Sequence, residues 1–558
     1  MFLPGDTEMP TVPSETPTRI VQTLARHGYN ADREAVTLLA RASDPVAAIE
    51  AVVSAAGDDT LRITSSDVRA CLDGDTVVTG AAVSASTSSE PSESTDSQAD
   101  TPQHPSSNTT SSTATKKSQN QQTKSGSPNE NRGSNSTGRK EVVGESTGTT
   151  DRSPDRDPTP ADITGDITGR STGTGEYGQF VTTFRDRYEQ LSALLRGRVN
   201  HRPATAIADM PGGSDAEMIG LVNDIRSTAS GHWLIELEDT TGTFPALVMK
   251  DRPIAELVDE LLLDECIAVQ GTLADDSGVL FTDSIHFPDV PRTFRPNTAD
   301  RHVQAALISD IHVGSQEFMA DAWNRFTDWL HTEEAEHVEY LLLAGDMVEG
   351  VGVYPDQDEE LDIVDIFDQY EAFSERLKAV PGDMEIVMIP GNHDAVRLAE
   401  PQPAFDAELR EIMSAHDPQI TGNPSLVTIE GVSILMYHGV SLDEVIAELP
   451  EEKASYDHPH KAMYQLLKKR HVAPQYGGKM RLAPETKDYL TIDTVPDIFH
   501  TGHVHKLGWG KYHNVLAVNS GCWQAQTAFQ KKVNIDPDVA HAPIVDLDTL
   551  EMTVRKFA

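Results

Sequence analysis

Cysteine is scarce in this chain of 558 residues, which has only Cys71, Cys266 and Cys522. Three cysteines so far apart predict neither a disulfide framework nor a thiolate zinc site. Apolar runs are also short, because none reaches about 18 residues and no charged N-terminal segment precedes an apolar core. We therefore expect a cytoplasmic protein that makes no contact with a membrane.

Basic residues are few, since 45 Lys and Arg stand against 88 Asp and Glu, for a formal net charge of −43. The acidic residues are spread through the chain and are not confined to one tail. Such a surface is typical of proteins from very salty cytoplasm, so we expect a halophilic archaeal source. A binder of basic partners is the alternative, and neither interpretation bears on the fold.

Aromatic residues are absent between Val83 and Tyr177, where Ser, Thr, Gly, Asn, Gln, Asp and Pro dominate. This composition cannot bury enough apolar surface to offset the entropy lost on ordering, which predicts a disordered linker over 77–178. Residues 1–76, before the linker, show helical periodicity and predict a small helical domain. Its simplest role is docking or stability without chemistry.

Residues 179–295 begin with a predicted helix at 180–198 and continue as runs that alternate in the manner of strands. Gly or Asp stands at the turns between these runs, a pattern that fits an OB-like β-barrel. Barrels of this kind often bind single strands on aromatic residues, but Trp233 and Phe244 are the only evident ones in its first half. A structural or subunit-docking role is therefore favoured.

Residues 296–558 contain five short polar segments, each at the end of an apolar run: SDIHVGS (309–315), AGDMVEG (344–350), PGNHD (390–394), YHG (437–439) and TGHVH (501–505). Side chains alternate along a strand, so Asp310 and His312 leave the first run on one face. Ligands outside the carboxyl ends of strands are usual in open α/β sheets. Any one segment alone would be read as a turn or a strand surface, but five in order predict one site.

The side chains of these segments suit metal ions. They offer imidazole, carboxylate and amide ligands, a mixture that suits manganese, iron, zinc or magnesium held as a pair. The predicted ligands are Asp310, His312, Asp346, Asn392, His438, His503 and His505.

In order and spacing, the five segments resemble the calcineurin-like metallophosphoesterase superfamily. Four strings narrow the resemblance: GVGVYPDQ (350–357), DHPHKAMYQLLKKRHVAPQYGG (457–478), FHTGHVH (499–505) and NSGCWQAQTAFQKKVNIDP (519–537). These strings resemble the small subunits of archaeal family D DNA polymerases. The resemblance implies a multi-domain α/β fold with an N-terminal helical domain, a disordered linker, an OB-like β-barrel and a C-terminal βαβ-sandwich metallophosphoesterase domain.

The resemblance also implies a function, a 3′ to 5′ exonuclease that proofreads single-stranded 3′ ends of DNA. A large catalytic subunit on a separate chain would complete a heterodimer or larger complex and could bring a sliding clamp. Two divalent ions, Mn²⁺ first and Mg²⁺, Fe²⁺ or Zn²⁺ as alternatives, would share Asp346. One ion would have Asp310, His312 and His505 as further ligands, and the other would have Asn392, His438 and His503.

Two residues beside the ligands receive roles by the same resemblance. His393 adjoins Asn392 without being needed as a ligand, so it would protonate the leaving 3′ oxygen or stabilise the transition state. Asp394 would orient His393 or His438, or it would only cap the turn.

Residues 461–487 reverse the acidic balance, with seven basic residues against Glu485. This position before the last polar segment predicts a DNA-backbone or partner surface formed by Lys468, Lys469 and Arg470. A solvated helix face is the alternative.

Two other functions remain open, a free metallophosphoesterase acting on small phosphoesters or nucleotides and a structural assembly subunit. The DHPHKAMYQLLKKRHVAP string and the barrel argue against the first, and the intact ligand set argues against the second. No nucleotide-binding loop and no additional carboxylate cluster is found, so DNA synthesis is expected from a partner chain.

Overall fold

The computed structural model describes residues 156–171, 175–354, 357–478, 480–533 and 535–558, the strand at 141–143 and parts of 20–74. Most of the linker predicted over 77–178 lies outside the described residues. None of the described helices has the length and apolar character that crossing a bilayer requires.

Among its described residues, the N-terminal segment contains the helices α2 (Arg33–Ala40), α3 (Pro45–Ala55) and α4 (Ser65–Gly74). A two-stranded parallel sheet of β1 (Asn30–Ala31) and β2 (Arg62–Ile63) joins them. Leu39, Val52 and Val68 are buried, as the helical periodicity predicts.

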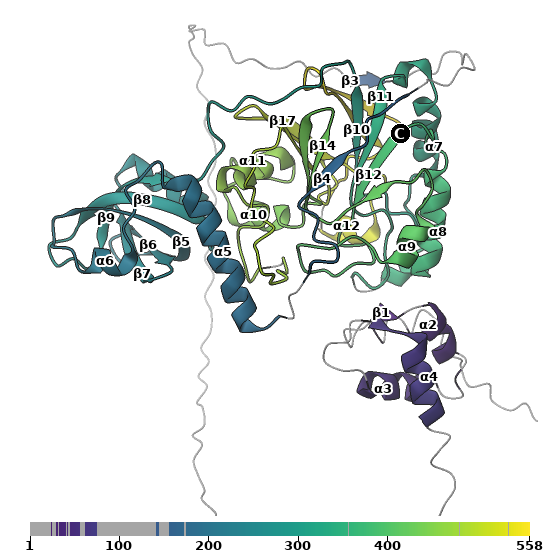
Figure 1. The fold of residues 1–558 in the computed structure, drawn as a ribbon, viewed down its shortest axis with the longest axis horizontal. Coiled ribbons are helices and arrows are strands. Elements are labelled where there is room, and N and C mark those ends of the chain that lie inside the picture. The colour runs from purple at the N-terminus through teal and green to yellow at the C-terminus, as the bar shows by residue number, and fades with distance from the viewer. Residues whose placement is uncertain are drawn as a thin grey trace, which may run out of the picture. The chain divides into compact units, whose positions relative to one another are not determined.

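A closed five-stranded barrel follows helix α5 (Tyr177–Leu195) and the short helix α6 (Ala204–Ala208). Its strands are β5 (Asp215–Ser227), β6 (Trp233–Asp239), β7 (Gly242–Val248), β8 (Cys266–Leu273) and β9 (Leu280–His286), in the order β5-β6-β7-β9-β8 (Figure 1). The 3-10 helix η2 (Pro253–Glu260) lies between β7 and β8 in sequence. Alternate strand residues such as Ile235 and Leu237 fill the interior.

Two sheets form the remainder, which we call the two-sheet domain. The first sheet has the order β13-β12-β11-β10-β19-β20-β3. Its strands are β10 (Gln304–Ile308), β11 (Val338–Ala344), β12 (Glu385–Ile389), β13 (Gln419–Ile420), β19 (His541–Asp546), β20 (Glu551–Lys556) and β3 (Glu141–Val143). The strands β10 to β13 are parallel, and β19 runs antiparallel beside β10.

The second sheet has the order β17-β18-β16-β15-β14-β4. Its strands are β4 (Asp162–Thr164), β14 (Ser425–Ile429), β15 (Val432–Met436), β16 (Ile498–Thr501), β17 (Leu507–Tyr512) and β18 (Val515–Ser520). Apolar residues from both sheets, including Leu342, Val387, Ile434 and Val518, form one buried cluster between them.

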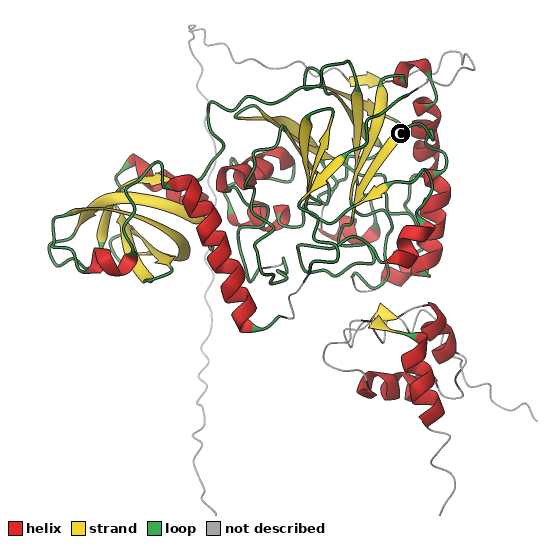
Figure 2. Cartoon of the chain, in the orientation of Figure 1, coloured by secondary structure: helices red, strands yellow, loops and turns green. Residues whose placement is uncertain are grey.

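Helices cover the two sheets, as Figure 2 shows. The first sheet packs against α7 (Ala320–Leu330), α8 (Ile366–Leu377) and α9 (Ala407–Ile412), and the second against α10 (Leu442–Glu448) and α11 (Pro459–Lys469). The 3-10 helices η3 (Glu333–Ala335) and η4 (Gln357–Glu360) and helix α12 (Ala528–Val533) complete the elements. Every residue of β11 is buried, which explains its unbroken apolar run.

The linker predicted over 77–178 extends too far. Strand β4 pairs with β14, and Ile163 lies opposite Val427. Arg156 is buried, where it forms a salt bridge of 3.1 Å with Asp383 and donates to the Ala335 carbonyl at 3.0 Å. Residues 156–171 are therefore part of the two-sheet domain. Composition missed them because so short a segment has few apolar side chains.

Candidate metal centre

The five polar segments meet where the two sheets present the carboxyl ends of their parallel strands. The first sheet contributes Asp310 and His312 after β10, Asp346 after β11, and Asn392 after β12. The second sheet contributes His438 after β15, and His503 and His505 after β16. The structure thus brings all seven predicted ligands together.

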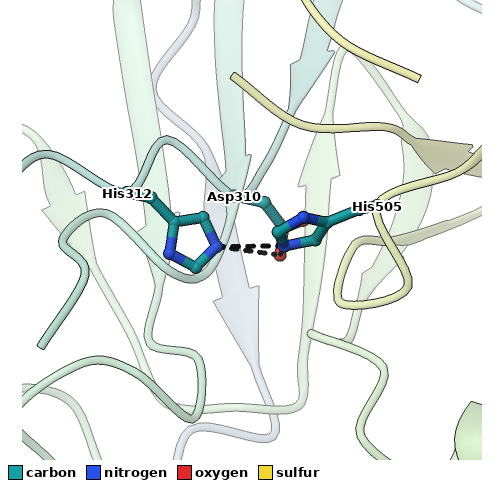
Figure 3. A group of neighbouring side chains, drawn as sticks. All are labelled: Asp310, His312 and His505. Carbon is teal, nitrogen blue, oxygen red and sulfur yellow. Dashed lines mark hydrogen bonds and ion pairs between the residues drawn. The ribbon is translucent and has the colours of Figure 1, made fainter. Parts of the chain in front are cut away.

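One group of donors consists of Asp310, His312 and His505 (Figure 3). The Nε2 atoms of His312 and His505 lie 3.0 Å apart, and His505 Nε2 lies 3.4 Å from Asp310 Oδ1. All three side chains are buried. Their ligand atoms lie within 4.8 Å of one another, as ligands of one ion would.

A second group surrounds the amide oxygen of Asn392. His438 Nε2 and His503 Nδ1 each lie 2.9 Å from Asn392 Oδ1. His438 Nε2 also lies 3.2 Å from Asp346 Oδ2. Asn392 and His503 are only partly buried, so this group faces solvent more than the first.

Asp346 lies between the two groups. Its Oδ2 is 3.8 Å from His312 Nε2 and 3.2 Å from His438 Nε2, while its Oδ1 accepts the His393 amide at 2.8 Å. One carboxylate therefore reaches both groups, which is the position that a bridging ligand needs.

The backbone at these positions is unusual. Five of the seven predicted ligands have a positive φ, between 53° and 72°: Asp310, His312, Asp346, His503 and His505. Non-glycine residues rarely adopt this conformation, and such strain concentrates at functional sites. Neighbouring glycines permit close packing, since a Cβ on Gly391 would overlap Asp346 and one on Gly502 would overlap Asp310.

Several carboxylates are buried at the centre. Asp310, Asp346, Glu349 and Asp394 are buried, and none of them has a salt bridge to Lys or Arg within the described residues. Buried carboxylates without a compensating cation are costly. Nitrogen and oxygen donors converging on this uncompensated charge fit a pair of divalent cations.

Histidine pKa values respond to this negative charge. Burial by itself lowers the pKa of His438, but the Asp346 and Asp310 carboxylates outweigh it and raise that pKa to about 10. Burial raises the pKa of Glu349, yet the neighbouring His312 more than reverses this and brings it to about 2. The centre therefore favours positive charge next to ionised carboxylates.

Three residues beside the ligands were not anticipated from the sequence. Glu349 Oε2 lies 2.9 Å from His312 Nδ1, and the Gln530 amide lies 2.9 Å from His505 Nδ1. Asp443 Oδ2 lies 3.5 Å from His503 Nε2. Glu349 belongs to the segment AGDMVEG and Gln530 to the string NSGCWQAQTAFQKKVNIDP. The sequence therefore placed both residues in functional segments, but it did not show that they contact His312 and His505.

His393 is partly buried at the edge of the centre. Its Nδ1 lies 2.7 Å from the Glu349 carbonyl oxygen, which can only accept, so Nδ1 is the donor. Nε2 is left to face a reactant. His393 also lies close enough to His312 and Asp346 to be a ligand, so the geometry alone permits both roles.

Asp394 forms no hydrogen bond, among the described residues, with either histidine that it was expected to orient. Its Oδ2 accepts the amides of Asp346 at 2.9 Å and Gly391 at 2.8 Å, and its Oδ1 accepts the Tyr370 hydroxyl at 2.9 Å. Asp394 therefore holds the loops after β11 and β12 together through their backbone, which is closer to the turn-cap alternative.

Lys468, Lys469 and Arg470 do not form the predicted DNA or partner surface. Lys469 Nζ lies 3.0 Å from Glu265 Oε2 with both side chains fully buried, and Lys468 pairs with Glu260 at 2.5 Å. Arg470 is buried and donates to the Ile492 carbonyl at 2.7 Å. The end of α11 faces the barrel, so the solvated-face alternative is also wrong. We call Glu260, Glu265, Lys468 and Lys469 the barrel joint.

Comparison with known proteins shows the family. The model of the DNA polymerase alpha/epsilon B-subunit family matches residues 305–506. The DNA polymerase II small subunit of Halobacterium salinarum is 63% identical over 554 residues, which cover 98% of this chain and 100% of the relative. The chain belongs to the DNA polymerase II small subunit family. This confirms the resemblance to the small subunits of archaeal family D DNA polymerases.

The family includes more distant relatives. The DNA polymerase II small subunit of Archaeoglobus fulgidus is 44% identical over 371 residues, covering 65% of this chain and 74% of the relative. Among solved structures, an archaeal phosphodiesterase is 14% identical and covers 45% of this chain and 98% of its own, with a TM-score of 0.25. That score supports no statement about activity.

Proposed function

We propose that this chain is the 3′ to 5′ exonuclease subunit of a replicative archaeal DNA polymerase and that it proofreads by hydrolysing DNA phosphodiesters. The observation that carries the proposal is the position of Asp346 between two groups of donors, in a centre whose buried carboxylates lack Lys and Arg partners among the described residues. Converging donors of this kind have little structural purpose without a cation.

The donor set suits two divalent cations, with Mn²⁺ as the first candidate and Mg²⁺, Fe²⁺ or Zn²⁺ as alternatives. Asp310, His312 and His505 would hold one, Asn392, His438 and His503 the other, and Asp346 both. When bound, two such ions activate a water and neutralise charge on a phosphodiester undergoing in-line displacement.

The remaining residues position and protonate. The Glu349 carbonyl fixes the Nδ1 proton of His393, so Nε2 carries a second proton only in the imidazolium form, and that proton is the one transferred to the leaving 3′ oxygen. Asp394 keeps the loop of Asp346 against the loop of Asn392 and His393 by accepting amides from both sides. Glu349 and Gln530 hold His312 and His505 in orientation through the ring nitrogens that face away from the donors.

A partner chain completes the proposal. Relatives in this family are named small subunits of DNA polymerase II, and this sequence has no nucleotide-binding loop, so synthesis would come from a large subunit on another chain. The closed barrel has the strand order expected of an OB-like domain and fits a docking role. A structural subunit without catalysis is the second candidate, but retention of all seven donors favours an enzyme.

The test is hydrolysis of single-stranded DNA labelled at its 5′ end, by the chain alone and with its large subunit, at molar salt with added Mn²⁺. A ladder shortening from the 3′ end, lost on metal chelation and restored by Mn²⁺, is the expected result. An inactive chain in both forms under each candidate metal would refute the exonuclease and leave the structural role.

A further inference from the structure

Helix α12 stands beside the metal centre and is held there by its own sequence. Thr527 and Gln530 cap its first turn reciprocally. The backbone N–H of Gln530 donates to Thr527 Oγ1 at 3.1 Å, and the backbone N–H of Thr527 donates to Gln530 Oε1 at 3.2 Å. The Gln530 side chain then reaches His505 Nδ1 at 2.9 Å. One turn of helix thus lies against a predicted ligand.

An aromatic pair extends from this helix towards His393. Phe529 stacks on Tyr354 with ring centroids 5.0 Å apart and an interplanar angle of 26°. The Tyr354 ring lies 6.3 Å from that of His393, and its hydroxyl donates to Glu349 at 3.1 Å. Phe529 nevertheless keeps 40% of its surface exposed. An exposed ring braced from behind, next to a candidate catalytic residue, is suited to stacking on a base.

Two lysines follow on the same helix. Lys531 and Lys532 are exposed, and neither forms a salt bridge within the described part of the chain. In a chain of net charge −43, two adjacent exposed lysines without an acidic partner among the described residues concentrate positive charge on this helix. That charge complements the phosphates of a nucleic acid backbone.

We propose that α12 binds the 3′-terminal nucleotides of single-stranded DNA beside the metal centre, Phe529 by stacking on a base and Lys531 and Lys532 by contacting phosphates. The inference rests on the proposed exonuclease and adds the surface that presents the substrate to it. The DNA would lie on α12. The basic residues at the end of α11 are not available to it, because Lys468 and Lys469 pair with glutamates of the barrel joint and Arg470 donates to the Ile492 carbonyl.

The first measurement is binding, by fluorescence anisotropy of a labelled oligonucleotide with a single-stranded 3′ end, added to the full chain. Phe529→Ala is expected to weaken binding about tenfold, and Phe529→Trp to restore it, because stacking accepts any flat ring. The matched control is Phe281→Ala, since Phe281 is 41% exposed but lies on barrel strand β9. Equal effects of the Phe529 and Phe281 variants would overturn the inference.

Salt separates the two contributions. Lys531→Gln with Lys532→Gln should weaken binding at low salt and reduce the slope of log K against log salt by about 1.4, for two phosphate contacts to a single strand. The loss caused by Phe529→Ala should persist at molar salt, because stacking is not screened. Lys250→Gln on the barrel is the control. An unchanged slope in the double lysine variant would overturn the phosphate contacts.

Hydrolysis tests the proposed function separately. For the Phe529 variant, kcat/KM on single-stranded 3′ ends should fall about tenfold relative to kcat/KM on bis(p-nitrophenyl) phosphate, mainly through KM. Weakened binding with no hydrolysis by the unmodified chain would support the α12 surface and refute the exonuclease. Hydrolysis of DNA by the unmodified chain with no change in that ratio would do the reverse.

Discussion

At the metal centre, the buried carboxylates of Asp310, Asp346 and Glu349 face histidines, whereas at the barrel joint the two buried carboxylates each face at least one lysine. Glu265 and Lys469 are as deeply buried as Asp310, so depth does not distinguish the two regions. The difference lies in pairing. Paired opposite charges hold elements together, while carboxylate, imidazole and amide donors gathered without Lys or Arg provide a site for a cation.

Removal of the shared carboxylate should have the largest effect. Asp346→Ala is expected to reduce DNA hydrolysis by at least about 10⁴-fold, because both groups of donors lose their common member. The fold should remain, since the change also removes one of several repelling buried carboxylates. Initial rates with Mn²⁺, metal content and thermal unfolding check this. Asp283→Ala, on the exposed surface of the barrel, is the control, and near-normal hydrolysis by the Asp346 variant would contradict the centre.

His393→Ala distinguishes chemistry from metal binding within the centre. Turnover should fall by about 10² to 10⁴, the usual contribution of a positioned acid or base, while both metals stay bound. Elemental analysis decides between the two roles of His393, because a lost metal would make it a ligand. His337→Ala, an exposed histidine in the same domain, controls for unspecific effects of removing an imidazole.

Substitutions at the barrel joint should lower the stability of the protein and leave hydrolysis unchanged. Lys469→Met leaves Glu265 buried without a cation and should reduce the free energy of unfolding by about 3–5 kcal/mol, measured by urea denaturation. Adding Glu265→Leu to that variant should recover most of the loss. The control is Lys378→Met, which breaks an exposed pair with Glu375 and should cost less than about 1 kcal/mol. A loss confined to hydrolysis would contradict the structural interpretation of this pair.

Glu400 is a buried carboxylate that belongs to neither region. Within the described residues it has no salt bridge to a lysine, and it is not one of the predicted metal ligands. Burial raises its pKa from 4.5 to about 7, so the folded protein holds this proton where the unfolded chain has released it. Its contribution to stability is complete below about pH 4.5 and is lost as the pH rises through 7, by about 3 kcal/mol. Glu400→Gln should remove this decline in a series of unfolding curves, while Glu375→Gln should not. A decline that persists in the Glu400 variant would mean that another group causes it.

The ligand positions could be predicted because they depend on local pattern. Apolar runs predict strands, and the common edge of parallel strands brings the runs together. Strand alternation is not what places Asp310 with His312, because both residues follow β10 in a loop and have a positive φ. That reasoning could not identify the hydrogen-bond partners of each side chain. Asp394 adjoins His393 in sequence, yet it accepts amides from loops instead.

The barrel joint was missed for a related reason. Lys468 and Lys469 stand among other basic residues in sequence, which suggested an open positive surface. Their acidic partners, Glu260 and Glu265, come about 200 residues earlier, and composition contains no information on which distant segments pack together. The strand β4, with a single apolar residue in three, was hidden in the same way among polar neighbours.

Strand β10, which leads to Asp310, pairs with β11 on one side and with β19 on the other. Gln304 on β10 and Asp546 beside it on β19 are 242 residues apart in the chain. During synthesis the barrel, closed by strands between 215 and 286, can fold early, but β10 keeps an open edge until β19 has left the ribosome. We therefore expect the metal centre to form after the barrel, and we expect no hydrolysis by a nascent chain before β19 has been made.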